Sequence, residues 1–327
     1  MNRPTVKARF HNFWHGEHTV SKSAAWLMFA IYALLLLSRL IDAFFLTREN
    51  QYLSTVLLQL LIFPIPAYLY IRLRGTALQG KLALTPPSLS HLFLLLSSIL
   101  MLISGCTLLG LVCGMMNAQP SFTLYDTFSS VHDGTASATV RLILAYGILP
   151  AFCEELIFRS ILCAEYEKHG ILYSSLLSSL FFALLHFDLT ALPVYLFAGF
   201  LLSTVRYVTR SAIASMIVHL GYNLFGIFVQ AGLSGYCRST GSIGLLVILL
   251  IALLLLSSAF FCGEVSRILS RRGSRDLLDN PAALSTPGLN RIPLRQWPSA
   301  VWHAFSYPPA VAAVLLWMVG FVIHLIR

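Results

Sequence analysis

Three short stretches place ionisable or polar side chains within a strongly apolar part of the chain. They are EELIFR (154–159), FFALLHF (181–187) and HLGYNLF (219–225). An ionisable side chain inside an apolar, membrane-length segment is costly to bury, so such residues are functional candidates by default. Because all three stretches fall within about 70 residues, we predict that their polar side chains meet in one active site.

Helical spacing assigns different roles to the charges of the first stretch. Glu155 and Arg159 are four residues apart, so they share one face of a helix and can form a supporting ion pair. Glu154 is rotated by about 100° from Glu155. We therefore expect Glu154 to point across the helix bundle toward His186 and His219.

These residue types are suited to hydrolysis by an activated water molecule. A glutamate in an apolar site can act as a general base, and His186 can share the proton of the attacking water. His219 and Asn223 are four apart on one helical face and can stabilise a developing oxyanion. Zinc held by Glu154, His186 and His219 is the alternative. We favour no cofactor, since asparagine is a poor zinc ligand and the sequence has no HExxH.

The composition indicates an integral membrane protein with an all-α fold. Of 327 residues, 57% are hydrophobic and 11% charged, against about 25% charged in soluble domains. A spanning helix needs about 20 mostly apolar residues, and about nine segments qualify, eight if the short fifth and sixth are not separate. The segments are 24–46, 53–72, 88–113, 138–163, 172–187, 189–206, 211–231, 241–262 and 306–326.

Charge placement predicts a cytoplasmic N-terminus and excludes nucleic acid as a partner. The net charge is +9, but the basic residues lie between apolar runs, as in cytoplasmic membrane loops. With the N-terminus inside, the inside loops hold sixteen Lys and Arg residues and the outside segments three. We divide the chain into 1–137, with an amphipathic segment and three helices; 138–231, the catalytic core; and 232–327, with further helices and a cytoplasmic linker, 266–304.

The histidine-rich HNFWHGEH segment offers a second metal hypothesis. His11, His15 and His18 share a helical face, which is a spacing that metal sites use. Phe10 and Trp14 lie among them, and an interfacial amphipathic helix accounts for all of these residues. We favour the amphipathic helix.

The three motifs, in this order, resemble those of the CPBP family of intramembrane proteases. This family includes Rce1-like CAAX-processing endopeptidases and bacteriocin-processing Abi proteins. EELIFR resembles the family motif EExxxR, FALLH resembles FxxxH, and HLGYN resembles HxxxN; the resemblance covers about residues 138–228. It implies that Glu154 activates water with the help of His186, and that His219 and Asn223 stabilise the oxyanion. Glu155, Arg159 and Phe182 match the remaining motif positions and would support the site.

Our hypothesis is an intramembrane endopeptidase of the glutamic type rather than a zinc metalloprotease. Its substrate would be a membrane-associated protein or peptide, either of the CAAX type or a bacteriocin or other peptide undergoing maturation. A transporter or proton or ion pathway using the same polar residues is the alternative, and a non-catalytic immunity or scaffold protein is a third. The lipid bilayer is the environment, and loop charges favour a bacterial plasma membrane.

Overall fold

The structure, a computed structural model, describes residues 20–45, 51–116, 136–229, 233, 235, 239, 243–279 and 294–326. These residues form helices and no strands, which confirms the all-α prediction. Five of the described helices are long and apolar enough to cross a membrane, and four shorter apolar helices accompany them. Each of these nine corresponds to one of the nine predicted segments, so the molecule is a polytopic membrane helix bundle.

The helices pack into two units, and the first consists of residues 1–83, 156–188 and 287–327. Its α-helices are α2 (Val20–Phe45), α3 (Gln51–Ile62), α4 (Pro64–Arg74), α5 (Thr76–Gln79), α10 (Cys163–Tyr166), α11 (Ile171–Leu184), α16 (Trp297–Phe305) and α17 (Pro308–Ile326). It also contains a π-helical turn, Leu156–Leu162, and 3-10 turns at Glu167–His169 and Leu294–Gln296.

The second unit consists of residues 84–155 and 189–286. Its α-helices are α6 (Leu92–Met116), α8 (Ala136–Leu142), α9 (Leu149–Glu155), α12 (Leu192–Thr209), α13 (Ala212–Phe228) and α15 (Gly244–Asp279). A 3-10 turn, Leu89–His91, precedes α6, and a π-helical turn, Ile143–Ile148, separates α8 from α9. The two units are defined by which helices pack together in space. The division at residues 137 and 231 was made from sequence and stays a prediction.

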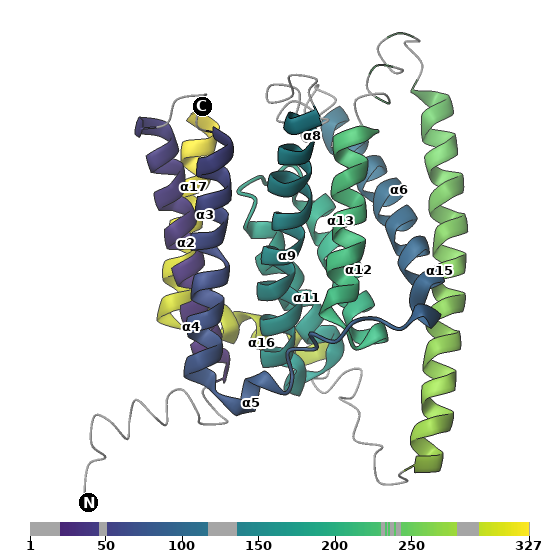
Figure 1. Cartoon of the computed structure of the whole chain (residues 1–327). Helices are drawn as coiled ribbons and strands as arrows, with labels where there is room; N and C mark the ends of the chain where they lie inside the picture. The colour runs from purple at the N-terminus through teal and green to yellow at the C-terminus, as the bar shows by residue number, and fades with distance from the viewer. Residues whose placement is uncertain are drawn as a thin grey trace, which may run out of the picture. The chain divides into compact units, whose positions relative to one another are not determined.

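Close backbone approach and buried hydroxyls hold the first unit together. Helices α2 and α17 run side by side (Figure 1). The Phe187 ring lies so close to Gly320 of α17 that a Cβ there would come within 2.4 Å of it. Tyr32 of α2 donates a hydrogen bond of 2.9 Å to the carbonyl of Phe181. The end of α11 is thereby fixed against both flanking helices.

Helix α6 is the centre of the second unit and contacts α12, α13 and α15 (Figure 1). Gly221 of α13 allows α13 to approach α6 closely, because a Cβ at this position would lie 2.7 Å from the Ile99 side chain. Helix α13 also starts with a well-formed cap: the Ser211 hydroxyl accepts from the amide of Ala214. The helix that carries HLGYN is therefore fixed at its start and along its length.

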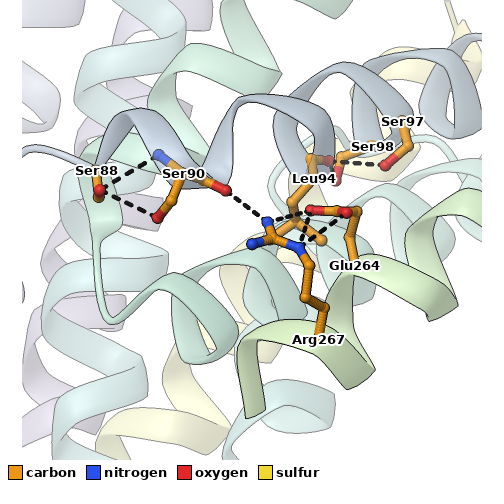
Figure 2. Close-up of polar contacts among 7 residues, drawn as sticks. All are labelled: Ser88, Ser90, Leu94, Ser97, Ser98, Glu264 and Arg267. Atoms are coloured by element: carbon orange, nitrogen blue, oxygen red, sulfur yellow. Dashed lines mark hydrogen bonds and ion pairs between the residues drawn. The ribbon is translucent and has the colours of Figure 1, made fainter. Parts of the chain in front are cut away.

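Helix α15 is longer than its apolar run. It continues to Asp279, so the first part of the predicted linker 266–304 is helical, as is its last part in α16. Adding residues to an existing helix costs little free energy. Helix α15 ends two residues before Pro281, the next proline in the sequence. Figure 2 shows how this extension is attached: Arg267 pairs with Glu264 one turn earlier and donates to the carbonyl of Ser90, before α6. The histidine-rich segment, residues 11–18, lies outside the described residues.

Candidate active site

One long helical run, Ala136–His169, carries the EELIFR motif. It changes between α and π geometry: the π turn Ile143–Ile148 precedes α9, and a second π turn begins directly after Glu155. Pro150 explains the first, because proline has no amide hydrogen and its ring would clash with the carbonyl four residues earlier. The wider turn just before it relieves that conflict. Since π turns are rare and concentrate at functional sites, two of them beside the motif support a site at this position.

Glu155 and His219 form a buried acid–imidazole pair within the second unit. The Nδ1 atom of His219 lies 3.0 Å from Oε1 of Glu155. The exposed fraction is 0% for Glu155 and 7% for His219, so water contributes little to the solvation of either group. A carboxylate accepts hydrogen bonds, so Nδ1 is the donor. Nε2 lies on the opposite side of the ring.

Asn223 attaches the same face of α13 to the motif helix. Its Nδ2 donates a hydrogen bond of 3.2 Å to the carbonyl of Gly147, in the π turn that precedes α9. Leu220 and Leu224 pack next to the same glycine. His219 and Asn223 thus face one helical run, at points eight residues apart, which confirms that they share a helical face. The amide of Asn223 carries two hydrogens, and this bond uses one.

His186, Phe182 and Arg159 form a contiguous group within the first unit. His186 lies in the turn that follows the end of α11 at Leu184, rather than within a helix extending to 187. Its Nδ1 is 3.1 Å from the carbonyl of Phe182. A carbonyl can only accept, so Nδ1 carries the hydrogen and Nε2 can act as a base.

Phe182 has a second contact that sequence reasoning missed. Its ring meets the His186 ring edge to face, with centroids 5.1 Å apart. The Arg159 guanidinium lies 4.4 Å from the centroid of the same Phe182 ring, a cation–π contact. Arg159 is fully buried. Phe182 therefore links a charge of EELIFR to the histidine of the next motif, which explains why an aromatic residue is useful at this position.

The candidate residues fall into both units. Glu154, Glu155, His219 and Asn223 belong to the second unit, and Arg159, Phe182 and His186 to the first. Glu154 is half-buried at the end of α9. The expected convergence of Glu154 with His186 and His219 stays a prediction, as does the ion pair between Glu155 and Arg159. The contact of Glu155 with His219 was not anticipated, since it requires knowledge of which helix packs against α9.

A metal site requires several ligands in one place. Among the described residues of each unit, no group of three His, Cys, Asp or Glu side chains lies close enough together to hold a metal ion. A zinc site made of Glu154, His186 and His219 would need ligands from both units.

Comparison with known proteins agrees with the motif resemblance. Residues 136–225 match the family model described as "Type II CAAX prenyl endopeptidase Rce1-like". The chain is also 32% identical over 94 residues to a protein of Bacillus subtilis (strain 168) named "Putative membrane peptidase YdiL". That match covers 28% of this chain and 38% of the relative. No solved structure gives a significant match.

The matched segment contains all seven candidate residues. The chain is thus an integral membrane protein, and its residues 136–225 are similar to Rce1-like CAAX endopeptidases. The predicted resemblance to the CPBP family of intramembrane proteases is confirmed for residues 136–225. The helices outside this segment are not covered by the family model.

Proposed function

We propose that the protein is an intramembrane endopeptidase that hydrolyses a peptide bond of a membrane-associated protein or peptide. The observation that supports this most directly is the buried Glu155–His219 pair, with Asn223 one turn further along α13. Paired carboxylate and imidazole groups beside an amide donor are typical of sites that stabilise an oxyanion. The family match over the same residues supports the choice of peptide hydrolysis over transport.

In the proposed reaction, the Glu154 carboxylate removes a proton from water while the oxygen attacks the carbonyl carbon of the substrate. The carbonyl oxygen becomes an oxyanion, which accepts hydrogen bonds from His219 and from the second amide hydrogen of Asn223. The proton taken from water then passes to the leaving nitrogen, and the C–N bond breaks to give a carboxylic acid and an amine. The participation of His186 with Glu154 is proposed from the motif match, and its Nε2 is the atom suited to hold the proton.

The first experiment compares the wild type with Glu154→Gln in proteoliposomes. Two probes are offered, a farnesylated CAAX-type reporter peptide and the same peptide without the lipid. Loss of cleavage in a variant that keeps the thermal unfolding profile of the wild type is the expected result, because glutamine cannot accept the water's proton. Cleavage at the wild-type rate by Glu154→Gln would refute the assignment. Cleavage of only the farnesylated probe would identify a prenyl-dependent substrate class.

A second experiment addresses the mechanism. Activity is measured after dialysis against a zinc chelator, and the zinc content of the purified protein is determined in parallel. We expect unchanged activity and substoichiometric zinc, as a glutamic mechanism requires. Activity that is lost on chelation and restored by added zinc would establish the metal-dependent alternative.

A further inference from the structure

Two serines of α11 form an unusual contact with the motif helix. The hydroxyl of Ser178 donates a hydrogen bond of 2.7 Å to the carbonyl of Phe158, and that of Ser174 donates one of 2.9 Å to the carbonyl of Cys163. Both serines are fully buried. Serine within a helix commonly bonds to a carbonyl of its own preceding turn, as Ser179 does with Ser175. Ser174 and Ser178, one turn apart, instead donate to another helix.

The two acceptors mark the π turn that follows Glu155. Phe158 lies within the turn Leu156–Leu162, and Cys163 is the first residue after it. Backbone hydrogen bonds join residues five apart in a π turn and four apart in an α-helix. Where one pattern changes to the other, some backbone groups have no partner within the helix. Buried backbone groups must find partners. The hydroxyls of α11 supply donors to carbonyls at this point.

A third hydroxyl attaches the same turn from the other side. Ser160, also within the π turn and fully buried, donates to the carbonyl of Leu82 in the segment after α5. Hydroxyls therefore connect the π turn to two neighbouring parts of the first unit. This matters because adding or removing one residue per turn rotates everything beyond it by about 100° around the helix axis. The π turn thus sets the rotational position of Arg159 and of the residues that follow it.

We propose that Ser178, assisted by Ser174, is a positioning residue that keeps the Leu156–Leu162 turn in its π form. In this form the helix holds Arg159 against the Phe182 ring, which contacts His186, and the proposed hydrolysis requires this arrangement. None of the three sequence motifs contains either serine. The proposal rests on the proposed peptidase function for its effect on the reaction, and on the hydroxyl contacts alone for its effect on the helix.

The test uses the full-length protein and a matched pair of variants. Ser178→Ala removes the donor to Phe158, whereas Ser179→Ala removes an equally buried hydroxyl of the same helix that bonds only within α11. Hydrogen exchange is measured by mass spectrometry over residues 150–166. We expect about fivefold faster exchange in Ser178→Ala, the factor given by one hydrogen bond of average strength, and less than twofold in Ser179→Ala. Equal exchange in the two variants would overturn the proposal.

Kinetics with whichever reporter peptide the wild type cleaves provide the second measurement. A positioning role predicts a kcat at least tenfold below the wild type for Ser178→Ala, an unchanged KM, and an unfolding temperature equal to that of Ser179→Ala. Ser178→Thr, which keeps the hydroxyl, should restore kcat. Equal kcat values for Ser178→Ala and Ser179→Ala would contradict the positioning role. Failure of the proposed function is recognised separately, since Glu154→Gln would then remain active.

Discussion

Two buried glutamates of the same helical run, ten residues apart, have very different surroundings. Glu165, near the end of the run, has both carboxylate oxygens engaged within the first unit. Arg74 donates from Nε to Oε1 at 2.6 Å and from Nη2 to Oε2 at 3.1 Å. The hydroxyl of Tyr70 also donates to Oε1, at 3.0 Å. Ser23 lies 3.0 Å from that Tyr70 hydroxyl. A permanent cation and a chain of hydroxyls therefore hold Glu165.

Among the partners of Glu155 is an imidazole: Nδ1 of His219 lies 3.0 Å from its Oε1. Histidine is the side chain that proteins use most often to transfer protons near neutral pH. Because a guanidinium stays charged at all ordinary pH values, the Arg74–Glu165 pair cannot move protons. The comparison favours a structural role for Glu165 and a role in the proposed hydrolysis for Glu155. The following predictions, from the largest expected effect to the smallest, test that contrast.

The largest effect is expected from Arg74→Ala, which leaves the Glu165 carboxylate buried without its cation. Removing one partner of a buried ion pair costs about 3–5 kcal/mol, and we expect this loss in the free energy of unfolding. Chemical denaturation in detergent micelles measures it. Arg72→Ala, two residues away in the same helix but exposed, is the control and should unfold like the wild type. A value for Arg74→Ala within 1 kcal/mol of that control would contradict a structural role for the pair.

Glu155→Gln should affect activity rather than stability. The amide retains the size of the side chain and an oxygen that can accept from Nδ1, but it removes the negative charge beside the imidazole. A hydrogen bond to a charged group contributes about 1.5–3 kcal/mol, which corresponds to about 10- to 100-fold in rate, so we expect kcat to fall by that factor. Steady-state cleavage of the reporter peptide checks it. Glu167→Gln, in the turn at the end of the same run, should change kcat less than twofold; equal kcat values for the two variants would refute the contrast.

Tyr70→Phe removes one hydroxyl from the Glu165 network and keeps the Arg74 pair. A hydrogen bond to a charged group contributes about 1.5–3 kcal/mol to stability. Because Arg74 still donates to both oxygens of Glu165, we expect the free energy of unfolding to fall by about 1.5 kcal/mol, the lower end of that range. Unfolding is again the measurement, while cleavage should be unchanged. A larger effect on kcat than on stability would show that the network acts on the site.

The smallest net effect is expected from replacing the whole pair, in the double variant Arg74→Met with Glu165→Leu. Exchanging a buried ion pair for apolar residues of similar volume is often neutral or stabilising. We therefore expect the free energy of unfolding to return to the wild-type value or above, although the single Arg74→Ala change is severe. If the double variant is as unstable as Arg74→Ala, the pair determines the packing of α4 against the motif helix.

Much of the fold followed from the sequence, because an apolar run of membrane length has few alternatives to a helix. The nine apolar segments and the three motif-bearing helices were predicted with boundaries within a few residues of those observed for most of them. Exceptions have physical causes: the turn at His186 follows α11 rather than belonging to it, and α15 continues past its apolar part. The apolar pattern of a sequence shows where a membrane-spanning segment ends. It does not show how far a helix such as α15 continues into polar residues.

The sequence by itself determined which residues are candidates. Polar and ionisable side chains are costly within membrane-spanning segments and are often functional there, and the candidates are Glu154, Glu155, His186, His219 and Asn223. Only the tertiary structure decided that Glu155 contacts His219, that the Phe182 ring contacts both Arg159 and His186, and that a π turn follows Glu155. Spacing along one helix gives the rotation of each side chain about that axis. Which neighbouring helix meets that face depends on the packing of the whole unit, and no local pattern records it.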